Sequence, residues 1–252
     1  MGEPVEGAAD FEGSAFDFVR REEVSEKIDP SLDAKTPSVP MTDWTQVFGI
    51  GARAVVRAVP KIANAYVYDY PCIRSGRQIR EIRALLSENG KKKSEPDAKL
   101  KTAVFVYGSV LLSPVGVRFQ PEYDYTILGK DKVGKTPVVI IDAKPKSGAL
   151  ETTNLFGQVW VDPKTVDVLR IEWDESRVRH HEFVEKLGEK FGRKPRLTIR
   201  SEFSAEKNGI RFPTRLYIQE AYLNERGRAF VRSETNVVYK DFKFFTGEVE
   251  VR

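Results

Sequence analysis

The stretch LFGQVWVDPKTVDVLRIEW, residues 155–173, decides the fold. Two apolar runs, Val159–Val161 and Val168–Ile171, flank a polar segment that begins with Asp162-Pro163. β-Branched and aromatic residues favour extended strands. Because Pro fixes its own φ and Asp bonds to nearby backbone, an Asp-Pro pair favours a turn. The stretch therefore predicts a β-hairpin.

The same succession of strand, polar turn and strand runs through most of the chain. Tyr66, Tyr68 and Tyr70 share one strand face, since successive side chains in a strand point to opposite sides. Asn208-Gly209 is the strongest short hairpin signal and separates two long apolar strands. Turn residues at 224–228 separate the next pair. We expect about ten to eleven antiparallel strands in meander order.

Two helices are predicted beside these strands. The first covers about residues 43–60, where Trp44, Phe48 and Val55 recur on one side of a helix. The second covers about residues 174–191, with Gly192 as its C-cap. Both are amphipathic, so each is able to cover an apolar sheet face. The basic run at 91–93 reads as a solvated loop tip.

These elements predict a mainly β (α+β) fold. Strands this long and aromatic should curl into a strongly curved antiparallel sheet or half-barrel, lidded by the N-terminal helix and the late inserted helix. Residues 1–41 form an N-terminal arm that is partly disordered, in which Phe16–Ile28 is apolar enough to dock as a strand or short helix. Residues 42–252 form the half-barrel domain.

Composition limits the classes of function. A net charge of +4, from 41 basic and 37 acidic residues of interspersed sign, argues against nucleic-acid binding. Cys72 is the single cysteine, so no intramolecular disulfide forms. No apolar run approaches the ~20 residues of a transmembrane helix. The first residues lack the basic and apolar regions of a signal peptide.

No catalytic, metal or cofactor site is predicted. His180 and His181, the only histidines, are followed by Glu185 where a zinc-peptidase helix needs a second His. Gly49-Ile50-Gly51 lacks the preceding strand and the third Gly of a dinucleotide loop. No Gly-x-Ser-x-Gly elbow occurs either. The sequence therefore favours a protein that is not an enzyme.

Four segments resemble the outer-membrane lipoprotein-sorting proteins, the LolA/LolB-like group, and particularly their uncharacterised bacterial branch. They are ANAYVYDY at 63–70, YTILG at 125–129 before a Val-Ile-Ile strand, FGQVWVD at 156–162 and YKDFKFF at 239–245. The resemblance covers about residues 43–252. It implies a curved half-barrel around an apolar cavity, a carrier of lipoprotein acyl chains, and a place in the periplasm or cell envelope.

Strand aromatics are the candidate ligand-binding residues. An apolar cavity needs few polar groups, and each buried methylene of an acyl chain contributes about 0.8 kcal/mol. The partner expected on this basis is an acyl chain of a lipid or lipoprotein. Alternatively, the same residues fill a packed core in a structural or interaction domain of the cell envelope, whose N-terminal arm binds an envelope protein by adding a strand to a sheet edge. The candidate cavity residues are Trp44, Phe48, Tyr66, Tyr68, Tyr125, Trp160, Phe203 and Tyr217.

Overall fold

Twelve antiparallel strands and two short α-helices make up the part of the chain that the structure describes. The structure is a computed structural model, and it describes residues 18–35, 59–75, 78–102, 120–146, 156–174, 181–207 and 210–245. The predicted helix at 43–60 lies almost wholly outside these residues. The predicted antiparallel, curved sheet with a late helix is confirmed.

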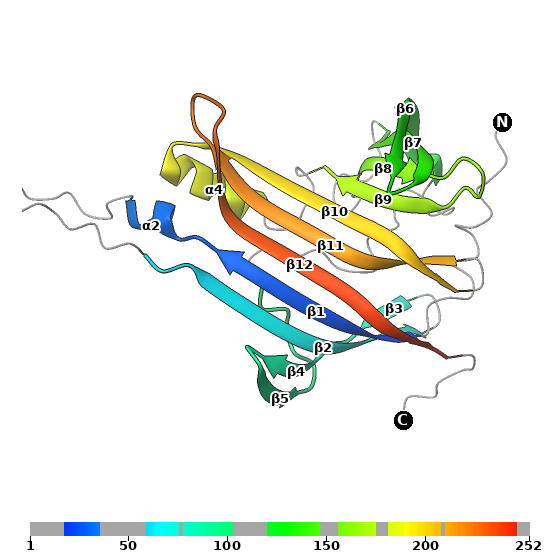
Figure 1. Ribbon diagram of the computed structural model, residues 1–252, viewed down its shortest axis with the longest axis horizontal. Coiled ribbons are helices and arrows are strands. Elements are labelled where there is room, and N and C mark those ends of the chain that lie inside the picture. The colour runs from blue at the N-terminus through cyan, green and yellow to red at the C-terminus, as the bar shows by residue number, and fades with distance from the viewer. Residues whose placement is uncertain are drawn as a thin grey trace, which may run out of the picture.

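The elements follow one another in a simple order (Figure 1). The first half of the chain gives β1 (Phe18–Ile28), α2 (Ser31–Lys35), β2 (Ile62–Ser75), β3 (Gln78–Glu81), β4 (Ala84–Glu88) and β5 (Lys91–Glu95). The second half gives a 3-10 turn, η2 (Gln120–Glu122), then β6 (Tyr123–Val133), β7 (Thr136–Pro145), β8 (Gly157–Val161), β9 (Val168–Trp173), α4 (His181–Phe191), β10 (Lys194–Lys207), β11 (Ile210–Leu223) and β12 (Ala229–Phe244).

The strand order across the sheet is β5-β4-β2-β1-β12-β11-β10-β9-β8-β7-β6, and β3 pairs with β2 off this path. Strands β6 to β12 therefore form the expected meander. The order also brings the two ends of the chain together, because β1 lies between β2 and β12. The first predicted segment, residues 1–41, thus supplies an interior strand, and a truncation of residues 1–40 would divide the sheet.

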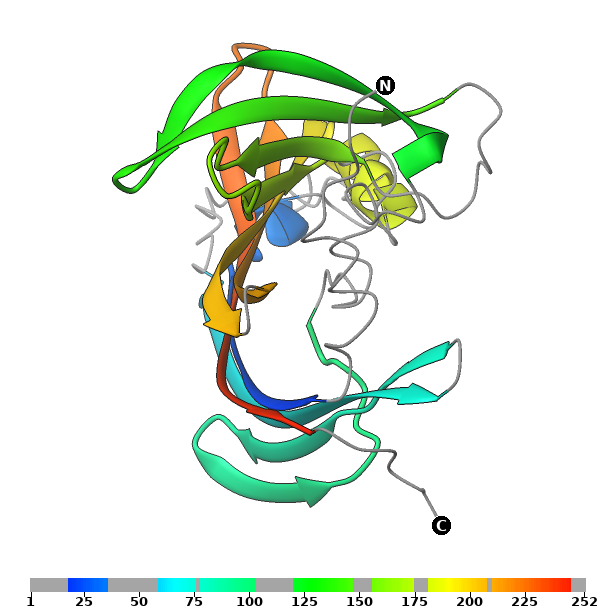
Figure 2. The same ribbon diagram turned by 90° about the vertical axis from the view of Figure 1, so that its right-hand side faces the viewer.

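The sheet is bent into an open arc (Figure 2). One end of the arc holds β6 to β9, the long strands β10, β11, β12, β1 and β2 form its middle, and β4 and β5 form its other end. Both α-helices lie on the inner, concave side. Leu32 of α2 and Val184 of α4 are buried in the same apolar cluster as the sheet residues. The helices therefore cover part of the concave face.

The hairpin that opens the sequence argument forms as predicted. Val159 pairs with Ile171, and Asp162 begins the turn between the two strands. The Asp162 side chain accepts a hydrogen bond from the backbone N–H of Lys164 at 2.9 Å. Val166, at φ 61°, donates its N–H to the Asp162 carbonyl at 2.8 Å. Asp162 is therefore a turn residue, as expected.

The charged segment after residue 87 differs from the prediction. Lys91–Glu95 is an exposed strand at the edge of the sheet and not a loop tip. Asn89 (φ 48°) and Gly90 (φ 76°) both have positive φ, which is what a two-residue hairpin turn requires. Lysines on an edge strand suit this position because their charge discourages pairing with another chain.

Candidate functional site

The concave face carries one continuous apolar cluster from β4 to β8. Its members come from strands that are adjacent in the sheet, because side chains at alternate positions face the same side. Leu187 and Phe191 of α4 pack against it, and the Phe191 ring meets Tyr222 edge to face at 5.0 Å. The buried sheet residues of this main cluster are Val24, Tyr66, Tyr68, Leu85, Val159, Val161, Ile171, Trp173, Leu197, Ile199, Phe203, Leu216, Ile218, Tyr222, Val237 and Tyr239.

Three of the eight candidate cavity residues belong to this main cluster. Tyr66 is 6% exposed, Tyr68 is fully buried and Phe203 is 2% exposed. The rings of Tyr66 and Tyr68 lie 6.3 Å apart on β2. The structure thus brings these three aromatics onto one face, although Tyr66 and Phe203 are 137 positions apart in the sequence.

The other candidates lie elsewhere. Trp160 packs in a separate small cluster with Val138 and Leu169, and its indole N–H donates to Asp131 Oδ2 at 3.1 Å. Tyr125 is 44% exposed on β6. Tyr217 points away from the main cluster, since its neighbours on β11 face inward, and its hydroxyl donates to Glu234 Oε1 at 2.9 Å. Trp44 and Phe48 lie outside the described residues.

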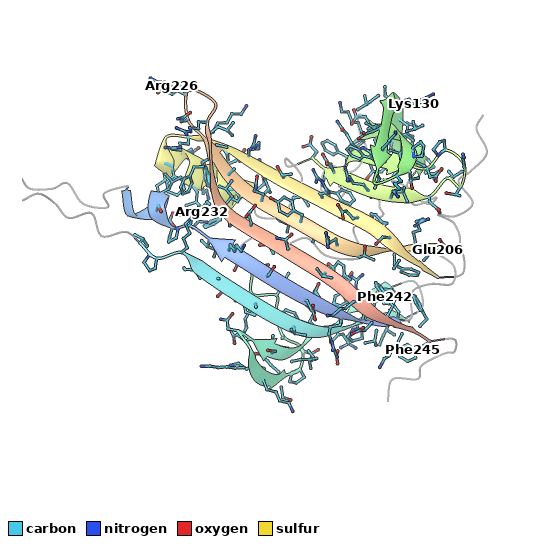
Figure 3. All side chains as sticks on the ribbon, in the orientation of Figure 1. Lys130, Glu206, Arg226, Arg232, Phe242 and Phe245 are labelled. Carbon is cyan, nitrogen blue, oxygen red and sulfur yellow. The ribbon has the colours of Figure 1, made fainter. Side chains whose placement is uncertain are left out.

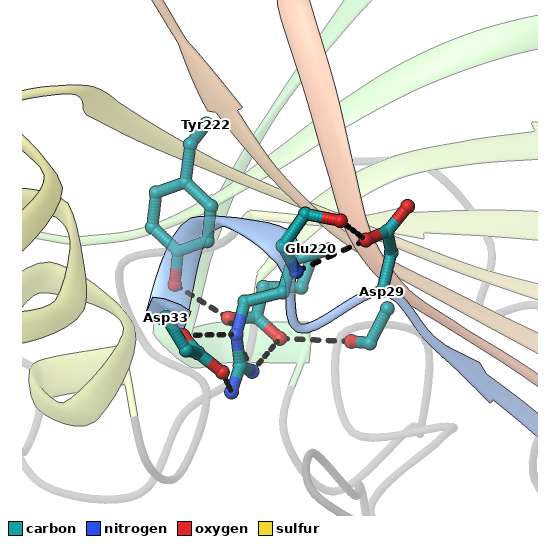
Figure 4. Close-up of polar contacts among 7 residues, drawn as sticks. Asp29, Asp33, Glu220 and Tyr222 are labelled. Carbon is teal, nitrogen blue, oxygen red and sulfur yellow. Dashed lines mark hydrogen bonds and ion pairs between the residues drawn. The ribbon is translucent and has the colours of Figure 1, made fainter. Parts of the chain in front are cut away.

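Charged groups are also buried on the concave face, which the sequence did not predict. At the end covered by α2, Glu220 is 1% exposed and accepts hydrogen bonds from Tyr222, Ser233 and Arg232 (Figure 4). Arg232 also holds Asp33 of α2 at 3.0 Å. Every charge in this group, the Glu220 network, has a partner of opposite sign.

A second charged group lies toward the start of β1. Arg83 donates to both carboxylate oxygens of Glu22, at 2.6 Å and 3.2 Å, and the two side chains are 8% and 1% exposed. Arg20 lies on the same face, 2% exposed, with its guanidinium carbon 3.7 Å from the ring centre of Tyr239 and 4.6 Å from that of Tyr70. We call these five residues the Arg20 cluster.

The two charged groups lie toward opposite ends of the long strands, as the pairing of β11 and of β1 with β12 places them. Figure 3 labels Arg232 at the end near α2 and Phe242 toward the far end of β12. Phe242 packs with Phe18 and Phe212, whose ring centres are 5.9 Å and 5.8 Å from its own. Arg20 lies 5.4 Å from the Phe18 ring, so the Arg20 cluster borders this far phenylalanine group.

Burial raises the pKa values of tyrosines across this face. The pKa of Tyr68 rises to about 12. Those of Tyr70 and Tyr239 rise through burial, although Arg20 and Arg83 act in the opposite direction. Burial together with the hydrogen bond to Glu220 raises the pKa of Tyr222. These phenols therefore stay neutral near pH 7 and serve as apolar walls and hydrogen-bond donors.

Within the described ranges, no group of three or more His, Cys, Asp or Glu side chains is arranged to hold a metal ion. His181 forms a contact with Glu185 at 3.2 Å, one turn along α4. None of the described helices has the length and apolar character to cross a membrane.

Sequence reasoning missed the buried Arg20 and Glu220 for one shared reason, whereas Arg83 lies in the connection between β3 and β4. A charged residue in an alternating strand is usually on the solvent side, and Arg20-Arg21-Glu22-Glu23 offers a charge on each face. The available signal was parity, because Arg20 and Glu22 fall on the same face as Phe18 and Val24. Parity alone does not show that Arg20 and Glu22 are buried, because the sequence does not say which face of the strand is covered.

This chain is similar to several solved structures at low sequence identity. No family model matches this chain, and no curated protein does. A DUF1329 family protein from Desulfovibrio piger is 12% identical with a TM-score of 0.41, over 98% of this chain and 96% of that one. A LolA superfamily protein from Nitrosomonas europaea is 10% identical with a TM-score of 0.37, over 97% and 93%. A putative outer membrane lipoprotein-sorting protein domain from Vibrio parahaemolyticus is 9% identical with a TM-score of 0.38, over 98% and 93%.

The structural neighbours are LolA-superfamily, lipoprotein-sorting and DUF1329 proteins. At 9–12% identity and TM-scores of 0.37–0.41, no function is taken from this likeness.

Proposed function

We propose that this protein is a non-enzymatic carrier or chaperone that shields acyl chains of lipids or lipoproteins in the periplasm or cell envelope. The observation that carries the proposal is the continuous apolar cluster on the concave face, which runs from β4 to β8. A curved apolar wall under short helices is the kind of surface on which a flexible hydrocarbon chain is hidden from water.

The energetics suit such a ligand. Burying about fifteen methylenes contributes about 12 kcal/mol before the cost of immobilising the chain, which takes back a large part of it. Affinity would come from contact with rings and aliphatic groups such as Tyr66, Tyr68 and Phe203, and no metal or cofactor is needed. The resemblance to lipoprotein-sorting proteins is what points to lipoproteins and to the periplasm.

The test is direct detection of ligand on the purified full chain. We expect native mass spectrometry to show bound acyl species, and solvent extraction to release them. Added hexadecanol should bind stoichiometrically below its solubility limit. Val237→Phe, which adds volume to the concave face where Val237 is 3% exposed, should weaken binding at least about tenfold by occupying space. Tyr217→Phe, at a side chain outside the main cluster, is the matched control.

A second candidate is a structural or interaction domain of the cell envelope with a filled interior. The ion pairs of Glu22 and Glu220 favour it, because permanently sealed charges suit a core that does not open. This candidate predicts that no acyl species is extracted and that no long-chain probe binds. An envelope protein would then be the partner, and its capture should survive Val237→Phe.

A further inference from the structure

Arg20 is buried on the concave face at 2% exposure, and its guanidinium forms no ion pair among the described residues. It lies on β1 between Phe18 and Glu22 in the alternation that faces inward. An arginine stays protonated in proteins, so its charge cannot be removed by titration. Burying it without a counter-charge costs free energy.

The aromatic rings around Arg20 contact the flat face of its guanidinium. Tyr239 and Tyr70 lie over the guanidinium at 3.7 Å and 4.6 Å, in the geometry of cation–π contacts. Such contacts engage the flat face of the group, whereas its N–H donors point outward in its plane. Nε of Arg20 is buried and has no hydrogen-bond partner among the described residues.

The neighbouring carboxylates, Glu22 and Glu81, both have partners. Glu22 is engaged by Arg83 through both carboxylate oxygens. Glu81 is near enough to raise the pKa values of Tyr70 and Tyr239, and it has interactions of its own. The next residue, Arg21, shows the contrast, because even on the outer face it lies 3.9 Å from Asp69 and 3.7 Å from Asp241.

We propose that Arg20 binds the anionic head, a carboxylate or a phosphate, of a ligand whose hydrocarbon tail lies along the concave face. This rests on the proposed function and assigns the ligand class: an anionic amphiphile in place of a neutral one. A planar guanidinium presents paired donors that match either anion.

The position of Arg20 fits a head-group site. It contacts Phe18, which belongs to the far phenylalanine group with Phe212, and it contacts Tyr239, which belongs to the main cluster. Apolar wall therefore extends to both sides of the charge along the strands. A head held at Arg20 leaves its tail on apolar surface, so one ligand uses both features at once.

The experiment compares three probes with the same sixteen-carbon tail: hexadecanoate, hexadecyl phosphate and hexadecanol, each below its critical micelle concentration. Dissociation constants are measured for the full chain and for Arg20→Met. The matched control is Arg21→Met, which removes the adjacent arginine from the opposite face. A charge-assisted hydrogen bond corresponds to a preference of about ten- to hundredfold.

We expect the natural chain to bind at least one anionic probe about tenfold or more tightly than hexadecanol. Arg20→Met should abolish that preference and leave hexadecanol binding within about twofold, and Arg21→Met should keep it. Preference for hexadecanoate assigns a carboxylate head, and preference for hexadecyl phosphate assigns a phosphate head.

Three results would overturn the assignment in distinguishable ways. Equal binding of all three probes rejects the role of Arg20 but keeps the acyl carrier. Binding of none rejects the carrier itself. A preference retained in Arg20→Met places the anion site elsewhere. If Arg20→Met does not fold, Arg20→Lys keeps the charge but loses the paired donors, and an unchanged preference in that variant counts equally against the proposal.

Discussion

The two ends of the concave face treat buried charge differently. At the end near α2, Glu220 and Arg232 are paired and Asp33 completes the network. In the Arg20 cluster, Glu22 and Arg83 are paired but Arg20 is not. A paired group holds the structure together, whereas an unpaired buried charge stays a cost until something neutralises it. The first end is therefore expected to act as a structural clamp, and the second is the end to which we assign ligand binding.

The largest expected effect is a difference in the free energy of unfolding between substitutions of the two arginines in the Arg20 cluster. Arg83→Met should lower the free energy of unfolding by about 3–5 kcal/mol, because Glu22, at 1% exposure, is left without its partner. Arg20→Met should change it by less than about 1 kcal/mol in ligand-free protein, because relief of a buried charge offsets the lost cation–π contacts. Urea unfolding of both variants measures the difference.

If Arg20→Met destabilises the protein as much as Arg83→Met does, Arg20 has a structural role and the contrast between the two ends disappears. Arg21→Met is the control for removing a positive charge. Its side chain is 42% exposed and its two ion pairs are long, so its effect should stay below about 0.5 kcal/mol.

At the other end, Glu220→Ala should cost about 3 kcal/mol. The change removes the acceptor of Tyr222 and Ser233 together, and it leaves Arg232 with Asp33 alone. Thermal or urea unfolding gives the value. Glu206→Gln, at an exposed carboxylate 3.6 Å from Arg211, should cost less than about 0.5 kcal/mol. Similar losses in both variants would show that the Glu220 network is no clamp.

Alkaline pH should weaken the fold through the buried phenols. The pKa of Tyr68 is about 12 in the folded chain and ~10 when unfolded. Between these values the unfolded chain releases a proton that the folded chain keeps, so stability is complete below pH 10 and falls as pH rises. Tyr68→Phe should reduce the loss at pH 11 by about 1.4 kcal/mol.

The measurement for Tyr68 is urea unfolding of the two proteins at pH 8 and pH 11. At pH 8 both states hold the phenol proton, so any difference between the proteins there reports packing alone and is subtracted. A Tyr222→Phe variant tests the same point at the clamp, where Glu220 adds to the effect of burial. An identical fall in natural and variant chains would mean that these phenols titrate normally.

Most strands could be predicted because side-chain alternation and turn chemistry are local signals. Asn208-Gly209 separates β10 from β11, which pair from Lys207 and Ile210 onward. Asn89-Gly90 carries the same signal, but the lysines after it masked an edge strand that has no buried face. The pairing of β1 with β12 could not be predicted, since it joins residues more than 200 positions apart.

The candidate site was harder to predict, because alternation assigns residues to two faces but does not say which is concave. Tyr217 and Phe203 looked equivalent in the sequence, yet Phe203 joins the main cluster and Tyr217 does not. Register shifts beside Phe203 and after Glu220 change the parity within a strand. Arg20 became a candidate only when its partners in three dimensions were known.

The smallest predicted effect concerns how α2 is held on the sheet. Asp33→Asn removes the carboxylate that Arg232 contacts at 3.0 Å and 3.3 Å, but Arg232 keeps Glu220. The global cost should therefore be only about 0.5–1.5 kcal/mol. Hydrogen exchange should quicken in α2 and stay unchanged in β1 if the clamp acts locally.

Asp241→Asn, at an outer-face carboxylate near Arg21, is the matched control and should leave exchange in α2 unchanged. Unchanged exchange in Asp33→Asn would mean that the packing of Leu32 alone holds the helix. Faster exchange would show that α2 is held on the sheet by Arg232, which also bonds to buried Glu220. An ion pair within the chain, Arg232 with Asp33, would then hold the helix over the concave face at the paired end. At the other end Arg20 has no such partner among the described residues, and we propose that a ligand takes that place.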